Sequence, residues 1–510
     1  GTAYARSTLL LGQTPAQAHA AARNFADYNI SPAGLGLTPN IDPNNPSAPR
    51  GTRFAAGSPE FKAAFDKVTA EADVLSGSKL VDNSRIYHSD ANYNLKDVIK
   101  FAEIQVGGSF RLYELNSHGR IYTDANGPIL YNEYGAYTQL TKKVMDDRLK
   151  LSGSIRYDKS KNFEGNYSPR ISAVYSAGEN KKHNFRASYQ TGFRNPSTQD
   201  QYIGFNVGSA ILLGSAPDNL TRYSEVRGNN INGSGQISAF GQSILGTNTV
   251  VMTGLNAYNN SYTATSVATG DPSKFKKTNL NYVKPEEVKA FELGYRSVLG
   301  KTSIDVNGYY NVYNNFIGNV NVLAPYYGIA QDAPNPTPNP ANPGFQSLAA
   351  IRSGDYRVYQ LYANTDVEIK SFGFGLGLSR KVIRDFEVGV SYNYAQFSFD
   401  NSNSNDPGFE ASFNTPKHRA KASIGNENLF KNFGFNLSGR WNSEYLWQST
   451  MVDGVIPEAT VIDAQVTYNV PSMKSAFKIG AANLGGREYF QVLGAGLIGQ
   501  QIFASWTIKP

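Results

Sequence analysis

The sequence predicts an all-β chain: a transmembrane antiparallel β-barrel with long extracellular loops. Three observations predict this fold class. Apolar and polar side chains alternate along many segments, the segments are long enough to cross a bilayer, and the connections between them alternate between short and long. None of the 510 residues lies in a stretch that approaches the roughly 18–20 consecutive apolar residues of a transmembrane helix.

Alternation with a period of two is the strongest of these signals. In residues 149–157, Leu151 and Ile155 fall on one face, and Ser152 and Arg156 fall on the other. Many segments of this kind have about 9–15 residues, which is enough for a tilted strand to cross a bilayer. Strands of soluble sandwiches usually have about 5–6 residues. The same alternation recurs in residues 184–191, 303–311, 386–394, 433–441, 462–468 and 502–508.

In chain order, the alternating segments predict about fifteen strands. Bacterial single-chain barrels have an even number of strands, and an unpaired edge in lipid is costly. We therefore expect this chain not to close a barrel alone, and we expect a plug domain and the first strands outside it. The strands are expected near residues 84–96, 100–114, 132–144, 148–159, 167–177, 182–193, 284–298, 301–316, 364–381, 386–399, 416–426, 433–447, 458–470, 475–484 and 497–508.

The connections between the strands predict the two ends of the barrel. Membrane barrels have short turns on the periplasmic side and long loops on the extracellular side. Short turns are expected near residues 145–147, 178–181, 299–301, 382–385, 428–432 and 471–474. Long connections are expected near residues 115–130, 195–282, 318–364, 400–415, 448–457 and 485–496.

The N-terminal region differs from the rest. Residues 1–83 read as an extracellular loop region with short helices, and residues 84–510 as the C-terminal part of the barrel. One helix is expected to begin after Thr14 and to reach about Tyr28, and another to begin after Ser58, because each start has a capping residue followed by proline.

The composition excludes several classes of function. The chain has no cysteine, so a disulfide framework, a thiolate metal site and a thiol nucleophile are excluded. Its five histidines lack the spacing of metal ligands, and no phosphate loop or nucleophile elbow occurs. The net charge of +7 is spread along the chain, so no nucleic-acid partner is expected. We expect no catalytic residue, no metal and no cofactor.

Four stretches resemble the TonB-dependent outer-membrane receptors, specifically their SusC-like branch. They are residues 189–202 (YQTGFRNPSTQDQY), 282–295 (YVKPEEVKAFELGY), 483–490 (NLGGREYF) and the aromatic last strand up to Pro510. The resemblance covers residues 84–510. It implies a barrel of about 22 strands, of which this chain supplies the last fifteen, with an N-terminal plug and a TonB box ahead of it.

The resemblance also implies a function and partners. It implies active import of a scarce solute (glycan, peptide or chelate) across the cell outer membrane of a Gram-negative bacterium. The implied partners are outer-membrane lipid, TonB through the missing N-terminal region, the plug with the remaining strands, and a SusD-like surface lipoprotein over the loops. Two alternatives stay open: a structural or assembly subunit of a multiprotein outer-membrane complex, and a passive pore.

Two sets of loop residues are candidates for substrate binding. Arg194, Asn195, Gln199 and Asp200 leave a strand for the longest loop, where they could contact substrate at the barrel mouth. We favour the alternative that they pair with neighbouring strands or with the plug. Tyr326 and Tyr327, in the next long loop, could stack on a sugar or clamp a peptide, and packing within the loop explains them equally well.

Arginines on the predicted inner face could favour an anionic solute. We favour a second interpretation, in which they pair with carboxylates on the same face or with plug residues. The arginines are Arg156, Arg186, Arg296 and Arg440, and the carboxylates are Glu292, Asp305 and Asp463.

Overall fold

The computed structural model describes residues 57–71, 77–208, 210–229, 236–399, 411–449 and 452–508, together with positions 14, 17, 20, 41–42, 45–49 and 54. The helix expected between Thr14 and Tyr28 therefore lies almost wholly outside the described residues. The second expected helix is confirmed as α3 (Pro59–Ala70), where the Ser58 hydroxyl accepts the backbone N–H of Phe61. A short antiparallel pair, β1 (Ile41–Asp42) and β2 (Asn45–Pro49), precedes it.

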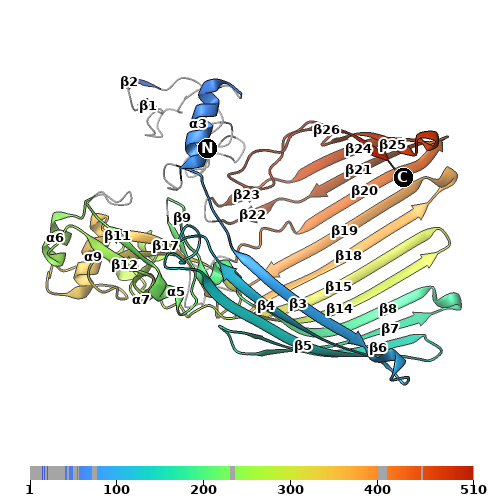
Figure 1. The fold of residues 1–510 in the computed structure, drawn as a ribbon, viewed down its shortest axis with the longest axis horizontal. Helices are drawn as coiled ribbons and strands as arrows, with labels where there is room; N and C mark the ends of the chain where they lie inside the picture. The colour runs from blue at the N-terminus through green and yellow to red at the C-terminus, as the bar shows by residue number, and fades with distance from the viewer. Residues whose placement is uncertain are drawn as a thin grey trace.

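One curved antiparallel sheet of fifteen strands forms the wall of a β-barrel (Figure 1). Each strand pairs with its neighbours in chain order, and β3 and β26 have one neighbour each among the described strands. The predicted strands are confirmed close to their expected positions. They are β3 (Arg85–Asn94), β4 (Glu103–Leu115), β5 (Ile129–Val144), β6 (Leu149–Ser160), β7 (Asn166–Ala177), β8 (His183–Arg194), β14 (Glu286–Leu299), β15 (Thr302–Asn314), β18 (Ile369–Lys381), β19 (Glu387–Ser398), β20 (His418–Phe430), β21 (Phe433–Asn442), β24 (Ala459–Val470), β25 (Ser475–Ala482) and β26 (Gln501–Ile508).

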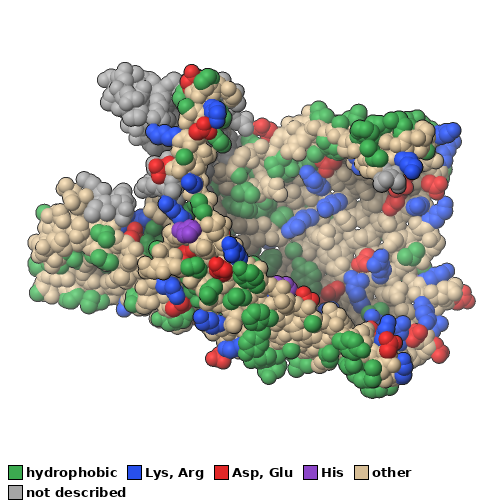
Figure 2. Space-filling model, viewed as in Figure 1, with side chains coloured by type: hydrophobic (Ala, Val, Ile, Leu, Met, Phe, Trp, Pro, Cys, Tyr) green, Lys and Arg blue, Asp and Glu red, His purple; other side chains and the backbone are tan. Residues whose placement is uncertain are grey.

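The two faces of the wall differ because alternate side chains point in opposite directions. The strand register aligns Ile171, Tyr189, Phe291 and Tyr310 in one row across four strands, and the large side chains of this row face outward. The hollow inner face carries charged and polar side chains, and many hydrophobic side chains lie on the part of the outer surface that this view shows (Figure 2). This arrangement suits a sheet with lipid outside and a polar lumen inside.

Short and long connections alternate as predicted, so the wall has a turn end and a loop end (Figure 1). At the turn end, Met145, Asp146 and Asp147 all adopt left-handed backbone angles and reverse the chain within a few residues. Short 3-10 turns complete this end: η1 (Leu95–Asp97), η2 (Glu179–Lys181), η4 (Ile383–Asp385) and η5 (Pro471–Met473).

The two longest connections are not simple loops. Their described residues fold together into one body at the loop end, which we call the loop lobe (residues 195–283 and 315–368) (Figure 1). Its five-stranded sheet has the order β13-β16-β17-β10-β9, with β10 parallel to β17. Its elements are α4 (Thr198–Tyr202), β9 (Gly204–Asn206), β10 (Ile211–Leu213), α5 (Asn219–Arg222), β11 (Ser224–Arg227), α6 (Ala239–Leu245), β12 (Val250–Thr253), α7 (Gly254–Asn259), β13 (Tyr262–Thr263), α8 (Ala264–Val267), η3 (Pro272–Lys274), β16 (Ile317–Pro325), α9 (Pro343–Ser353) and β17 (Tyr356–Asn364).

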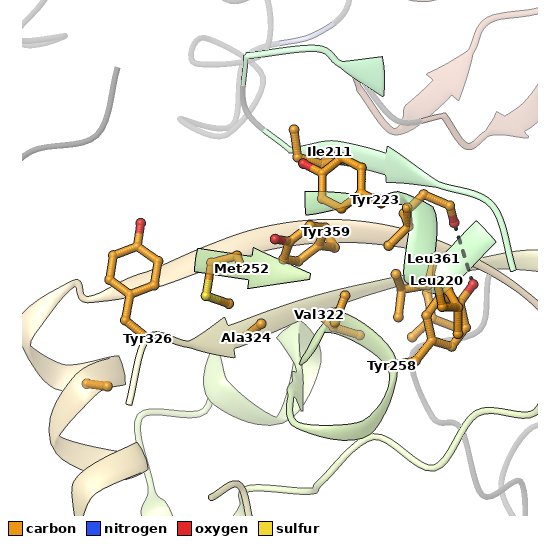
Figure 3. Close-up of a cluster of buried hydrophobic side chains, with 14 of the residues drawn as sticks. Ile211, Leu220, Tyr223, Met252, Tyr258, Val322, Ala324, Tyr326, Tyr359 and Leu361 are labelled. Atoms are coloured by element: carbon orange, nitrogen blue, oxygen red, sulfur yellow. Dashed lines mark hydrogen bonds between the residues drawn. The ribbon is translucent and has the colours of Figure 1, made fainter. Parts of the chain in front are cut away.

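The loop lobe contains the largest packed hydrophobic cluster of the described chain (Figure 3). Val322, Tyr359 and Leu361 from its sheet are fully buried against Leu220 and Tyr258 from its helices. The Tyr258 hydroxyl donates to the carbonyl of Tyr362 at 2.8 Å, so its polar end is satisfied inside the core. Large buried aromatic side chains of this kind give the lobe a core of its own, separate from the wall.

A second, smaller cluster lies at the same end near the last strands. The hairpin of β22 (Tyr445–Trp447) and β23 (Gly454–Ile456) packs Val452 and Ile456 against Phe490 and Leu493. None of the helices that the structure describes combines the length and apolar character needed to cross a lipid bilayer.

Candidate functional site

A pocket of about 610 Å³ lies at the loop end of the wall, on its inner face. We call it the mouth pocket. It lies where β4, β5 and β6 meet the segment that leaves β8 for the loop lobe. Its polar lining includes Arg111, Tyr113, Tyr131, Glu133, Arg156, Asp158, Lys159, Asn195 and Ser197.

The chain enters the loop lobe through a short capped helix. β8 ends before Pro196, which lacks a backbone N–H for continuing the ladder. Ser197 caps α4, and its hydroxyl accepts the N–H of Asp200 at 3.1 Å. The Asp200 carboxylate accepts the N–H of Ser197 at 2.8 Å in return, which completes a capping box. This box sets the start of α4 directly after Asn195 and Pro196.

Arg194 joins the wall to the loop lobe. Its Nε donates to the Glu286 carboxylate, and its Nη1 lies 3.8 Å from Asp200 Oδ2. Arg194 and Glu286 are register partners on β8 and β14. The other Glu286 oxygen accepts the N–H of Ile317, the first residue of β16, at 2.9 Å. From the sequence we expected Arg194 to pair with a neighbouring strand, and its contacts with Glu286 of β14 agree with that expectation.

The environment of Asp200 shifts its acid–base equilibrium. Burial raises the pKa of the Asp200 carboxyl above its ordinary value of 3.8, and the nearby carboxylate of Glu286 adds to this effect. The hydrogen bonds from Ser197 and the charge of Arg194 act in the opposite direction, and burial prevails. Ionised Asp200 is therefore less favourable in the folded lobe than in the unfolded chain.

Asn195 and Glu133 form the polar centre of the mouth pocket. The Asn195 amide donates to Glu133 Oε1 at 2.9 Å, and the Tyr113 hydroxyl donates to Glu133 Oε2 at 3.2 Å. The rings of Tyr113 and Tyr131 stack with their centres 4.6 Å apart, and Tyr202 of α4 follows at 5.7 Å from Tyr131. Tyr131 and Tyr202 are buried in a packed cluster, so the rings support the pocket from behind, and the Glu133 carboxylate and the Asn195 amide are the groups that can hydrogen-bond a polar solute.

The remaining predicted residues lie in the loop lobe. Gln199 donates to the Tyr362 hydroxyl at 2.5 Å, and burial raises the pKa of Tyr362 to about 12. Tyr326 and Tyr327 are buried in the lobe core, with 9% and 4% of their surface exposed. The Tyr327 hydroxyl donates to Asp355 at 2.9 Å. The structure thus brings Arg194, Asn195 and Asp200 together and leaves both tyrosines apart from the mouth pocket.

The prediction that inner-face arginines pair with carboxylates is confirmed. Arg156 makes two hydrogen bonds to Asp158, at 2.5 and 2.6 Å. Arg186 lies 3.4 Å from both Glu292 and Asp305. The other two pairs are Arg296–Asp305 at 4.0 Å and Arg440–Asp463 at 3.3 Å.

Sequence reasoning missed Glu133, Tyr113 and Glu286 as members of this region. Glu286 follows a proline at the point where the chain re-enters the wall, and an acidic residue there is a usable signal. Glu133 and Tyr113 stand on different strands, and only the strand register brings them to the same face as Asn195. Among the described residues, no group of three or more histidine or acidic side chains is placed to hold a metal ion.

Residues 4–484 match the family model described as TonB dependent receptor-like, beta-barrel. None of the curated proteins matches the sequence.

Several solved structures share the fold. The FrpB iron transporter of Neisseria meningitidis (F3-3 variant) is 12% identical with a TM-score of 0.50, over 83% of this chain and 55% of that one. The siderophore receptor PirA of Acinetobacter baumannii is 12% identical with a TM-score of 0.50, over 84% and 56%. A mutant ferric enterobactin receptor, PfeA of Pseudomonas aeruginosa in complex with enterobactin, is 11% identical with a TM-score of 0.52, over 85% and 55%. The chain spans about half the length of these structures.

Proposed function

The chain belongs to the TonB-dependent receptor β-barrel family, and from this premise we propose that it takes part in active import of a scarce solute across the outer membrane of a Gram-negative bacterium. Proteins of this family are transporters and receptors of that membrane and work with TonB. In this proposal residues 84–510 are the C-terminal part of the barrel, and residues 1–83 are an extracellular region. A plug and further strands complete the barrel.

The observation that carries the proposal is the arrangement of the wall. An apolar outer face, a polar hollow and a polar pocket at the loop end suit a protein that receives a solute on one side of a membrane and passes it along a lumen. FrpB is described as an iron transporter and PirA as a siderophore receptor, so an iron chelate is one candidate solute. Glycans and peptides are the other candidates. The motifs that resemble the SusC-like branch add a SusD-like surface lipoprotein as a proposed partner.

Within the mouth pocket, we propose that Asn195 and Glu133 contact the solute. Arg194 and Asp200 join the loop lobe to the wall near Glu286, and Gln199 joins α4 to Tyr362 within the lobe. For Tyr326 and Tyr327, their burial supports a packing role, and substrate contact at these positions would require the lobe to open.

Uptake measurements test the proposal. Cells carrying the full-length receptor should accumulate radiolabelled solute only when TonB and the proton-motive force are present. Uptake that continues unchanged without TonB would contradict active transport and favour a passive pore.

Substitution in the mouth pocket tests the site. Glu133→Gln should weaken solute binding about tenfold, because loss of one charged hydrogen bond has roughly that effect. Glu179→Gln at the turn end is the matched control, since Glu179 is exposed and distant from the pocket. Equal affinity of both variants would contradict the assignment.

The loop lobe favours a second candidate function. A folded body with its own core at the loop end suits docking of partner proteins in a multiprotein outer-membrane complex. Purification from native membranes tests this, because stoichiometric partners other than a lid lipoprotein would favour the structural role.

A further inference from the structure

The outer face of the wall is hollowed over β5, β6, β7 and β8, which lie side by side in the sheet (Figure 1). We call this depression of about 550 Å³ the outer groove. Its floor consists of Gly153, Ala173 and Ala187, which leave the space open because their side chains are small or absent. The side chains around this floor are large and mostly apolar: Leu140, Leu151, Ile171, Tyr189, Phe291 and Leu293.

One positive charge stands beside the outer groove, towards the turn end. Lys142 of β5 is the register partner of Leu151, and Leu140, two residues before it, is the register partner of Gly153. Lys142 therefore projects from the same face as the groove, with Gly153 as its diagonal neighbour. Its Nζ lies 5.7 Å from the centre of the exposed Phe101 ring. A cation over an aromatic ring keeps its charge and can still donate hydrogen bonds.

No carboxylate balances Lys142 on this face. Among the residues that the structure describes, the turn-end halves of β4 to β8 have no aspartate or glutamate on their outer side. Asp146 and Asp147 belong to the turn beyond the strand end, and no ion pair within the described chain joins either of them to Lys142. Glu103 of the neighbouring strand faces the lumen and accepts from Asn94 at 2.7 Å.

Lys142 stands at the level of lipid headgroups. It lies two residues before Val144, the last residue of β5. The next register row towards the turn end contains Tyr175, Phe185 and Tyr295, and aromatic rows of this kind mark the membrane interface in barrels. A lysine that faces lipid is costly at the bilayer midplane and nearly neutral at the interface. Short turns of membrane barrels face the periplasm, so this interface belongs to the periplasmic leaflet.

We propose that Lys142 and the outer groove bind one anionic phospholipid of the periplasmic leaflet. The Lys142 ammonium donates to the phosphate, and one acyl chain lies over Gly153 along the groove. A phospholipid combines the two features that this face requires, a negative charge at headgroup level and hydrocarbon directly beside it. A plug would lie in the lumen, and further strands would pair with the edges β3 and β26, so neither covers this face. The inference depends on the membrane-spanning wall and goes beyond transport, so a receptor without uptake would leave it standing.

Native mass spectrometry of the detergent-purified full-length receptor tests the headgroup contact. One molecule of dioleoyl-phosphatidylglycerol should bind about fivefold more tightly than dioleoyl-phosphatidylcholine, which has no net charge, because one lysine near an anionic lipid contributes about that factor. Lys142→Gln should remove this preference. Lys143→Gln is the matched control, because the next side chain along β5 faces the lumen. A preference that is absent from the wild type, or that survives Lys142→Gln, would overturn the proposal.

Filling the outer groove tests the acyl-chain contact. Gly153→Phe should weaken binding of both lipids about tenfold, since the ring replaces contacts with roughly two methylene groups. The wall can accept this ring, because a Cβ on Gly153 meets nothing within 4 Å. Gly439→Phe is the matched control: Gly439 of β21 is equally free of neighbours, and its register partner is the exposed Ile462.

Two outcomes of this second experiment would overturn the proposal. The first is equal lipid affinity of the Gly153→Phe and Gly439→Phe receptors. The second is a wild-type receptor that is dimeric in detergent and becomes monomeric after Gly153→Phe, because a second copy of the chain would then occupy the outer groove.

Discussion

At the residue scale, Glu286 links two strands of the wall and the first residue of a lobe strand. It accepts from Arg194 and from the backbone of Ile317, which belong to β8 and β16. The two sequence stretches that resemble the family most clearly meet at this ion pair, so their similarity has a structural explanation. A motif that holds two elements together serves the fold, so its presence does not depend on which solute a member of the family carries.

Glu286→Gln should loosen the loop lobe. The amide keeps the size of the side chain but leaves the Arg194 guanidinium without its carboxylate, at a cost of about 1–2 kcal/mol to the stability of the lobe. Hydrogen exchange followed by mass spectrometry should show faster exchange in β16 and α4. Glu287→Gln, one residue on and exposed, is the matched control. Equal exchange in the two variants would rule out an anchoring role.

Asp200 makes the stability of the loop lobe depend on pH. Its pKa is raised in the folded state, so its contribution to stability is fully present below the unfolded value of about 3.8 and is lost as the pH rises through the folded pKa. The difference in melting temperature between the wild type and Asp200→Asn should therefore change between pH 7 and pH 4, and it should favour the wild type more at the acidic end. A difference that does not vary with pH would contradict this.

At the scale of single elements, the inner face of the wall depends on glycines covered by larger side chains. A Cβ on Gly373 would meet the Tyr309 hydroxyl at 2.5 Å and would collide with the backbone carbonyl of Tyr394. A ring lying over a glycine on the neighbouring strand fills the space that the missing side chain leaves. These glycines therefore fix the orientation of the tyrosines that line the lumen.

Gly373→Val should destabilise the wall by about 1–3 kcal/mol, because the backbone carbonyl of Tyr394 has no room to move aside. Gly153→Val is the matched control, since a Cβ on Gly153 meets nothing within 4 Å. Unfolding in urea, monitored by the heat-dependent mobility of the barrel on gels, gives the comparison. Identical midpoints for the two variants would show that the contact can relax.

The strands of the wall were predictable because each has its own alternation of apolar and polar residues. The strands of the loop lobe were not, for a physical reason. β9, β10 and β13 have two or three residues each and are partly or fully buried, so they carry no period of two. β10 pairs in parallel with β17, which lies in a distant part of the chain, so the local sequence does not predict this pairing. For the same reason the sequence alone does not link Glu133 to Asn195.

At the scale of the whole molecule, the loop lobe has a main core of its own, and a smaller cluster that includes Tyr131 and Tyr202 joins it to the wall. The ends of β8 and β14 are register partners, and so are those of β15 and β18, so each gap that the lobe fills could be bridged by a short turn. The lobe's core residues lie outside the strands of the wall. The barrel should therefore tolerate removal of the lobe.

Replacement of residues 197–284 and 316–367 by short glycine-containing turns should leave a barrel that still inserts into membranes. Its strands should keep their far-ultraviolet signature and their resistance to protease, while solute binding at the mouth should fall because the pocket loses the wall formed by α4. An aggregated product would instead show that the wall needs the lobe to fold.

The parallel pairing of β10 with β17 has a consequence for the order of events during biogenesis. The first half of the lobe leaves the wall after β8 and the second half after β15, so the hairpin of β14 and β15 is synthesised between them. The first half must wait, unpaired, until its partner has been synthesised and delivered to the same side of the membrane. We therefore expect the first half of the lobe to be exposed without its partner strand during assembly, where a chaperone that binds unfolded chains would protect it from aggregation.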